Sequence, residues 1–246
     1  MKCLILAAGY ATRLYPLTEN FPKPLLDVGG RSIADRLVDD ISRCPKVDGF
    51  VVITNHKFAG HFERWAASRS ETITVVDDGT STNETRLGAV RDMKFAVDSL
   101  GIAGEDLLVV AGDNVLSFSL KEFVEYAGGK NASCVMRYRE PSLQRLRKCG
   151  VLEVDPDDRV RSMEEKPAEP RSHWCCPPFY YYTAADAALV GEAIASGCGT
   201  DAPGSLVAYL CSVSKVYAMQ MPGPRYDVGS LDSYREICAM FSQMQM

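Results

Sequence analysis

The stretch LILAAGYATRLYPLTENFPKPLL, residues 4–26, begins as an apolar strand and then changes to three small residues, Ala7, Ala8 and Gly9. Without bulky side chains, the backbone N–H groups of such a turn can approach a ligand closely. Arg13 follows the turn, and Lys23 stands between two prolines, which restrict the backbone on both sides of it. This pattern indicates a binding site for an anion such as phosphate. A tight strand-to-loop turn with solvated surface charges is the alternative interpretation.

Length, charge and cysteine content limit the class of protein. The chain has 246 residues, enough for one domain with a substantial core, and a net charge of −5, which argues against a nucleic-acid surface. It shows neither an apolar run of membrane-spanning length nor a signal-peptide layout, so we expect a soluble, cytoplasmic protein. Its nine cysteines form no CxxC pair and are expected to be reduced and mostly buried.

Short apolar runs alternate with helical patterns along the chain. Strands are expected at 2–7, 49–54, 72–76, 106–111, 132–137, 150–154, 178–182 and 215–220, and helices at 32–43, 57–69, 87–99, 119–128, 184–196, 204–211 and 230–242. The alternation predicts an α/β fold, Rossmann-like and three-layered (α/β/α), with a mainly parallel mixed sheet whose antiparallel additions lie in the second half. We expect a single domain that binds its ligands at the carboxyl ends of the strands.

A second motif is LLVVAGDN, residues 107–114, in which an apolar strand ends at Gly112 and Asp113. The strand places this carboxylate at the carboxyl edge of a central strand. Mg²⁺ prefers such a site, where one or two carboxylates combine with phosphate oxygens and water. A turn or helix-capping aspartate is the alternative.

Two further motifs lie in the second half. Asp227, in RYDVGSLDSY (residues 225–234), lies too early to cap the helix that follows. MEEKP (residues 163–167) ends a strand with Glu165 next to Lys166, just before a proline. Adjacent strand residues point to opposite faces, so both can reach one ligand only if the strand ends or bulges there.

In this order, the four motifs resemble those of the sugar-1-phosphate nucleotidylyltransferases, the glucose-1-phosphate thymidylyltransferase-like enzymes, over residues 1 to about 242. The resemblance implies the nucleotide-diphospho-sugar transferase fold, with a nucleotide-binding half at about 1–130 and an acceptor-binding half at about 131–246. It also implies an enzyme of the EC 2.7.7 type for nucleotide-sugar biosynthesis. With Mg²⁺ as cofactor, such an enzyme transfers NMP from dTTP or UTP to a sugar-1-phosphate and releases pyrophosphate.

Position by position, the resemblance implies these roles. The nucleotide-binding residues are Leu6, Ala7, Ala8, Gly9, Ala11, Thr12, Arg13, Lys23, Arg86, Gly88, Gly112 and Asp113. The catalytic residues are Arg13, which supports loss of pyrophosphate, Lys23, which neutralises the α-phosphate, and Lys166. The metal ligands are Asp113 and Asp227. The acceptor-binding residues are Gly150, Glu165, Lys166 and Tyr181, with Glu165 facing the sugar hydroxyls and Lys166 the sugar phosphate.

Two segments depart from the best-known members of that family. The base-reading loop is DDGTSTNETRLGAVRDM (residues 77–93), in which Asn83 or Arg86 could read a pyrimidine edge, so the base stays open. The segment HWCCPPFYYY (residues 173–182) replaces an expected Asn-Ala-Gly, so the acceptor stays open as well. Its aromatic residues could face a quaternary ammonium group, although simple alternation along a strand also explains them.

Two other functions therefore remain as alternatives. One is a CTP-dependent cytidylyltransferase acting on phosphocholine or a phosphonate. The other is a catalytically silent, nucleotide-binding regulatory subunit, against which the presence of every charged site residue speaks. As partners we expect a nucleoside triphosphate and a small phosphorylated acceptor, with neither nucleic acid nor membrane; a homo-oligomer is left open.

Overall fold

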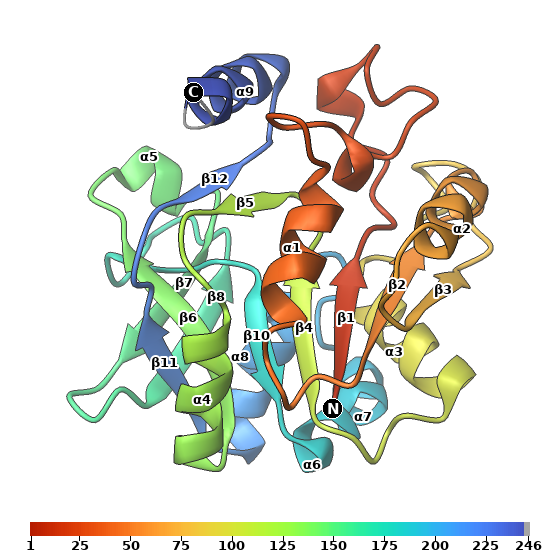
Figure 1. Ribbon diagram of the computed structural model, residues 1–246. Coiled ribbons are helices and arrows are strands. Elements are labelled where there is room, and N and C mark those ends of the chain that lie inside the picture. The colour runs from red at the N-terminus through yellow and green to blue at the C-terminus, as the bar shows by residue number, and fades with distance from the viewer. Residues whose placement is uncertain (244–246) are drawn as a thin grey trace.

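The computed structural model describes residues 1–243 and confirms an α/β fold built on one ten-stranded mixed sheet (Figure 1). Across the sheet the strands follow the order β3 (Ile73–Asp77), β2 (Gly49–Thr54), β1 (Lys2–Leu6), β4 (Leu107–Ala111), β10 (Phe179–Tyr182), β6 (Ser133–Arg139), β9 (Trp174–Cys176), β7 (Gly150–Val154) and β8 (Val160–Glu165), and β11 (Val216–Gln220) pairs with β6. The four strands of the first half are parallel, whereas β10, β9, β7 and β8 are antiparallel to their neighbours in this order. The expected antiparallel additions are therefore confirmed.

Helices cover both faces of the sheet and produce the three layers (Figure 1). They are α1 (Ile33–Ile41), α2 (Ala59–Ala67), α3 (Ala89–Leu100), α4 (Lys121–Lys130), α5 (Leu143–Leu146), α6 (Ala184–Ala187), α7 (Val190–Ala195), α8 (Gly204–Val213) and α9 (Leu231–Gln243). Because strand side chains alternate between faces, Ile5 of β1 belongs to the core cluster under α1 and α4, and Leu4 belongs to the cluster under α3, α7 and α8.

The shortest strands were not predicted from the sequence. Strands β5 (Asn114–Leu116) and β12 (Arg225–Asp227) form a separate antiparallel ribbon, and each is too short to show a periodic pattern. The three-residue strand β9 was not expected, and of β8 the sequence indicated only the carboxyl end at Glu165. The single helix expected at 184–196 is instead two short helices, α6 and α7.

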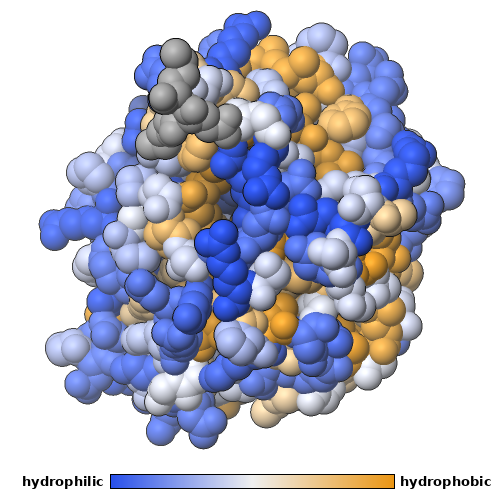
Figure 2. All heavy atoms as spheres, in the orientation of Figure 1, coloured by the Kyte–Doolittle hydropathy of each residue, from blue (hydrophilic) through white to orange (hydrophobic). Residues whose placement is uncertain are grey.

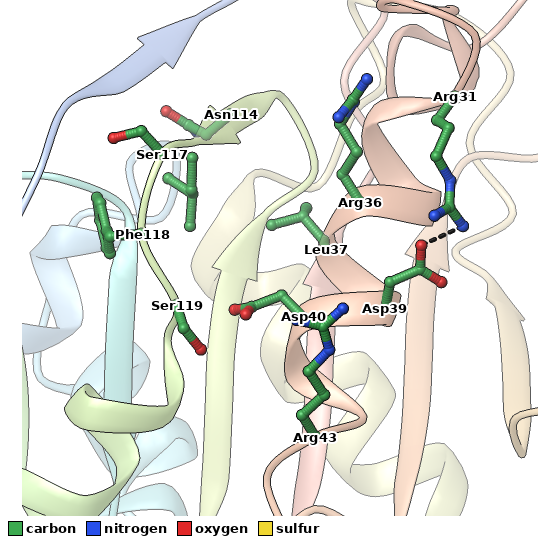
Figure 3. A pocket seen from close by; sticks show the side chains of 11 residues that line it. Arg31, Arg36, Leu37, Asp39, Asp40, Arg43, Asn114, Ser117, Phe118 and Ser119 are labelled. Atoms are coloured by element: carbon green, nitrogen blue, oxygen red, sulfur yellow. Dashed lines mark ion pairs between the residues drawn. The ribbon is translucent and has the colours of Figure 1, made fainter. Parts of the chain in front are cut away.

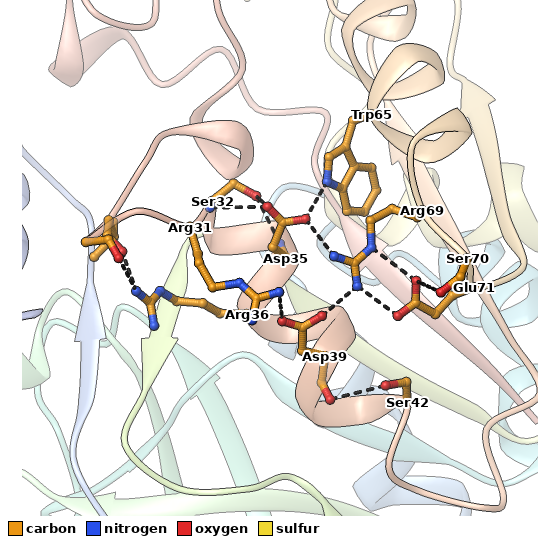
Figure 4. A network of polar contacts seen from close by, with 12 residues as sticks. Arg31, Ser32, Asp35, Arg36, Asp39, Ser42, Trp65, Arg69, Ser70 and Glu71 are labelled. Carbon is orange, nitrogen blue, oxygen red and sulfur yellow. Dashed lines mark hydrogen bonds and ion pairs between the residues drawn. The ribbon is translucent and has the colours of Figure 1, made fainter. Parts of the chain in front are cut away.

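A polar network fixes α1 against the segment between α2 and β3 (Figure 4). Arg69 stands at its centre, and its guanidinium pairs with Asp35 at 3.1 Å, Asp39 at 2.6 Å and Glu71 at 2.8 Å. The hydrogen bond from this guanidinium holds the pKa of Glu71 below its ordinary value. Trp65 of α2 donates its indole N–H to Asp35 at 2.9 Å, which adds a second link between the two helices.

The surface in Figure 2 mixes hydrophilic and hydrophobic residues. Three large hydrophobic side chains, Tyr15, Leu17 and Phe21, are exposed on the loop after β1. No helix within residues 1–243 is long and apolar enough to cross a bilayer. The cytoplasmic location remains a prediction from the sequence.

Candidate active site

Buried side chains bond to one side of the loop after β1, and the other side of the loop is open. Asn55, a buried residue directly after β2, donates its side-chain amide to the Ala8 carbonyl at 2.9 Å. Thr18, also buried, donates its hydroxyl to the Ala11 carbonyl at 2.8 Å. A Cβ atom added to Gly9 would meet nothing within 4 Å. The small residues are therefore not required for packing at Gly9, and space is left in front of the loop for another molecule.

Lys23 is buried, and its ammonium lies between two carboxylates. The residue opens a 3-10 turn, Lys23–Leu25, directly after Pro22, which has extended backbone angles. Its Nζ lies 2.8 Å from Asp113 Oδ2 and 3.9 Å from Asp227 Oδ1. The prolines thus place the lysine, as its sequence context indicated, and an ammonium so close to two acids compensates their charge.

Asp113 and Asp227 come from distant parts of the chain and lie side by side. Asp113 follows β4 and Gly112, where a Cβ atom would come within 2.9 Å of the Pro24 ring. Asp227 ends β12, which pairs with β5 so that Asp227 lies opposite Asn114. The backbone N–H of Val228 also donates to the Asp113 carbonyl at 3.1 Å. The ribbon of β5 and β12 therefore brings the two carboxylates together.

Two residues that the sequence analysis missed orient these acids. Asn114 is fully buried and donates its amide to Asp113 Oδ1 at 2.6 Å, while Arg225 donates to Asn114 Oδ1 at 2.6 Å. Asn114 directly follows Asp113 in the LLVVAGDN motif, so its position in the sequence could have indicated that it lies in the site. Burial and the nearby Asp113 raise the pKa of Asp227, although Lys23 and Arg225 partly oppose this shift.

The pair of carboxylates fits a magnesium ion. Two acids that repel each other and share one lysine are the kind of donor set a divalent cation can neutralise. Residues 1–243 contain no group of three or more His, Cys, Asp and Glu side chains placed to hold a metal. This is compatible with Mg²⁺, which takes one or two carboxylates and fills its other positions with phosphate oxygens and water.

Two cavities lie on either side of Gly9. One, of about 230 Å³, collects the expected phosphate-binding residues, and the other, of about 220 Å³, lies against α3. The first is lined by Leu6, Ala7, Gly9, Ala11, Arg13, Lys23, Pro24, Ala111, Gly112 and Asp113. The second is lined by Leu6, Ala8, Gly9, Arg86, Gly88, Ala89, Asp92 and Asp201. Of the expected nucleotide-binding residues, only Thr12 lines neither cavity.

Three of the four expected acceptor residues, Gly150, Glu165 and Lys166, lie at the same edge of the sheet. Gly150 pairs with both Cys176 and Glu165, and after Cys176 the chain leads to Pro178, whose carbonyl accepts from the backbone N–H of Ala111 at the carboxyl end of β4. Strand β8 ends at Glu165, as expected, and Lys166 turns the chain with a positive φ of 49°. Burial raises the pKa of Glu165, and the charge of Lys166 opposes that shift. Neither cavity beside Gly9 is lined by these residues.

The role expected for Tyr181 is wrong. It was expected to bind the acceptor, but it is buried within the core and its hydroxyl donates to Asp106 at 2.5 Å, just before β4 begins. It pairs with Leu108 in the antiparallel register of β10 and β4, so it points to the end of β4 opposite the site. The position of Tyr181 along β10, and not the chemistry of its side chain, excludes it from the acceptor site.

The aromatic segment around Tyr181 forms core, not a cation site. Tyr180 and Tyr182 are buried in one core cluster, and Tyr181 and Phe179 belong to the other, as alternation along a strand requires. The ring of Trp174 already has the Arg137 guanidinium 4.7 Å from its centroid. The structure thus gives the quaternary-ammonium interpretation no support.

A third cavity, of about 380 Å³, lies away from the loop, between α1 and the segment after β5 (Figure 3). Three arginines and two aspartates line its wall, and some of them are already paired. Arg31 forms an ion pair with Asp39, and Asp40 accepts from the backbone N–H of Leu120 at 2.8 Å. Because this cavity shares no lining residue with the two cavities beside Gly9, we assign it no role in binding the phosphates.

A loop with one open side, a buried lysine and two convergent carboxylates at the carboxyl edge of a mixed sheet form the arrangement expected of a nucleotide-binding α/β transferase. The chain belongs to the nucleotidyl transferase family, whose model matches residues 2–243. It is 27% identical over 251 residues to a glucose-1-phosphate adenylyltransferase of Fervidobacterium nodosum, an alignment that covers 95% of this chain and 59% of that protein. It is also 27% identical to the bifunctional protein GlmU of Methanocaldococcus jannaschii, covering 93% of this chain and 51% of the other. The chain thus spans between about half and three fifths of the length of these relatives.

Solved structures show the same fold. A putative glucose-1-phosphate thymidylyltransferase from Bacillus anthracis superposes with a TM-score of 0.80 at 20% identity, covering 98% of this chain and 95% of that one. A UDP-glucose pyrophosphorylase complexed with UDP-glucose superposes with a TM-score of 0.83 at 19% identity, covering 99% and 98%.

Proposed function

We propose that this chain catalyses Mg²⁺-dependent transfer of a nucleoside monophosphate from a nucleoside triphosphate to a sugar-1-phosphate, with release of pyrophosphate. The observation that carries the proposal is the cluster of Lys23, Asp113 and Asp227 beside the open face of the Gly9 loop. It combines a cavity large enough for phosphate groups, a cation and a pair of acids that could hold a metal. The names of the matched proteins, all nucleotidyl transferases or sugar-nucleotide enzymes where the name states an activity, support the same class.

The reaction proceeds without a covalent enzyme intermediate. A phosphate oxygen of the acceptor attacks the α-phosphorus, the bond to the β-phosphate breaks, and pyrophosphate leaves from the opposite side. Such a transfer requires positioning and neutralisation of charge more than a strong base. Arg13 and Lys23 line the same cavity; we propose that Arg13 contacts the departing phosphates and that Lys23 neutralises the α-phosphate.

Asp113 and Asp227 would hold the metal, which when bound neutralises charge on the phosphate oxygens. In the structure Lys23 compensates the two acids. With the two acids compensated by a bound cation, the Lys23 ammonium would be available to face the α-phosphate.

For the acceptor we propose a hexose-1-phosphate, with Lys166 facing its phosphate and Glu165 accepting from its hydroxyls. Both residues lie where β8 ends, at the edge of the sheet that holds the loop. The expectation of dTTP or UTP as donor rests on resemblance alone. Matched proteins are named for adenylyl and thymidylyl transfer, so the resemblance does not decide between bases.

The test is pyrophosphate release by the purified protein with Mg²⁺, using ATP, CTP, GTP, UTP and dTTP, each with a panel of hexose-1-phosphates, phosphocholine and a phosphonate. We expect turnover with a hexose-1-phosphate and at least a hundredfold loss in Asp113→Asn. Nucleotide binding without release from any pair would instead support a silent regulatory subunit. Turnover restricted to phosphocholine or the phosphonate would refute the sugar acceptor.

A further inference from the structure

The cavity between the Gly9 loop and α3 has an unpaired acid in its wall. Asp92 lines this cavity, lies in the first turn of α3, and is only 6% exposed. Its Oδ1 is buried and has no hydrogen-bond partner among the described residues, and it does not cap the helix. A buried carboxyl group without partners is costly, so its presence calls for an explanation.

The other walls of this cavity are already engaged. Gly88 has a φ of +90°, and a Cβ atom there would come within 2.6 Å of the Thr200 carbonyl oxygen, so this wall is a closely packed backbone. Arg86, one of the two residues expected to read a base, forms an ion pair with Asp201 at 3.1 Å on the rim. Of the two acids that line the cavity, Asp201 is exposed and paired with Arg86, whereas Asp92 is buried and its Oδ1 has no hydrogen-bond partner among the described residues.

The placement of the cavity suggests what enters it. It shares Leu6 and Gly9 with the cavity that is lined by Arg13 and Lys23, so a nucleotide with its phosphates beside Arg13 and Lys23 can extend its base into the cavity beside Asp92. Its volume of about 220 Å³ can contain a single nucleobase. This step rests on the function proposed above.

We propose that Asp92 reads the nucleobase of the donor and selects a base with an exocyclic amino group, as in cytosine or adenine. A carboxylate only accepts hydrogen bonds, and an amino group on the base edge supplies the donor it lacks. Uracil and thymine present a carbonyl oxygen at the same position, which would leave two acceptors face to face. This choice of base differs from the dTTP or UTP that the sequence resemblance favoured.

The selection requires the ionised form of Asp92, because a protonated carboxyl group could donate to a carbonyl oxygen. Burial raises the pKa of Asp92 to about 7, and the charge of Asp78 adds to the shift. An amino donor would stabilise the ionised form and lower that pKa again. Binding of the preferred base near pH 6.5 therefore releases protons.

Asp78 provides a matched control. It is 7% exposed and also has one carboxylate oxygen, Oδ2, without a partner. Its Oδ1, however, accepts from the backbone N–H and the hydroxyl of Thr80, both at 2.7 Å, and it does not line the cavity. Neutralising Asp78 removes a buried charge but leaves the Asp92 side chain in place, and because Asp78 raises the pKa of Asp92, the change favours the ionised acceptor.

The experiment measures both the dissociation constant and kcat/KM for CTP, UTP, ATP, ITP and dTTP in the wild type, Asp92→Asn and Asp78→Asn. CTP and ATP carry an exocyclic amino group at the position where UTP and ITP, respectively, carry a carbonyl group. We expect the wild type to favour the amino member of one pair by at least tenfold, and the better pair identifies the base. In Asp92→Asn the amide can donate to a carbonyl, so the preference should shrink at least tenfold, while Asp78→Asn keeps it. If Asp92→Asn does not fold, the same measurements are made with Asp92→Ser, which also removes the charge.

The outcomes separate the two proposals. A wild type that prefers UTP, dTTP or ITP, or Asp92 variants with unchanged base ratios, would overturn the role of Asp92 while leaving nucleotidyl transfer in place. Selective binding of CTP or ATP without pyrophosphate release from any acceptor would overturn the proposed function and leave the base contact standing. Failure to bind any nucleotide would overturn both.

Discussion

Replacing Lys23 by methionine tests whether the lysine holds two acids together. Methionine keeps the length and apolar stem of the side chain but removes the charge that lies 2.8 Å from Asp113 and 3.9 Å from Asp227. The two carboxylates would then face each other without compensation. We expect the variant to be less stable without metal, and to recover when Mg²⁺ is added.

The magnitude follows from the distances and the exposure. Opposite unit charges 2.8 Å apart attract by about 6 kcal/mol at an effective dielectric of 20 and by about 1.5 kcal/mol in water. The side chains of Asp113 and Asp227 are 34% and 50% exposed, so solvent screens both and the lower end applies. We therefore expect a loss of about 2 kcal/mol in the free energy of unfolding, or roughly 4–8 °C in melting temperature for a chain of this size.

The assay is thermal and urea unfolding with and without millimolar Mg²⁺, in the absence of nucleotide. Mg²⁺ should raise the melting temperature of Lys23→Met more than that of the wild type, because in the wild type the ammonium competes for the same carboxylates. Lys121→Met is the control, since its pair with Glu125 spans 3.8 Å between exposed groups and should contribute almost nothing. A Lys23→Met protein with wild-type stability and no added response to Mg²⁺ would refute the reasoning.

Three further predictions concern the neighbouring residues. Gly9→Val should keep its melting temperature within a few degrees, because the added side chain meets open space, yet weaken nucleotide binding at least tenfold by calorimetric titration; an unfolded variant would favour the tight-turn interpretation. Lys166→Ala should raise KM for every phosphorylated acceptor, whereas Glu165→Ala should raise it for hexose phosphates far more than for phosphocholine; equal effects would exclude a contact between Glu165 and the sugar. Because the folded pKa of Asp92, about 7, lies above its unfolded value near 4, wild-type stability should decrease as pH rises from about 4 to about 7, and Asp92→Asn should lack that decrease in urea unfolding measured across this range.

The parts of the site that lie in continuous motifs were accessible from the sequence. The small residues before Tyr10 and the lysine between prolines constrain the backbone wherever they occur, so their local structure followed from their order. The carboxylate of Asp113 follows a strand that is apolar throughout, a pattern typical of a buried parallel strand. Such local rules located most of the residues around the two cavities.

What the sequence did not predict depends on long-range packing. Asp92 looks like an ordinary acid in the first turn of a helix, and only the packing of α3 on β1 and β2 shows that it is buried. Asn55 looks like a residue at the end of a strand, and its bond to Ala8 requires β1 and β2 to be neighbours. Tyr181 was misplaced because the direction of β10 in the sheet reverses which end of the strand is near the site.

The ribbon of β5 and β12 has a consequence for biosynthesis. The ribosome delivers the chain from its amino end, so Lys23 and Asp113 are available to pair long before Asp227 emerges. Until β12 arrives, β5 has no partner in the ribbon, and the acid cluster contains one carboxylate for one lysine. The nascent protein therefore passes through a stage in which this cluster is electrically balanced. Its affinity for divalent metal should appear only when synthesis has passed Asp227.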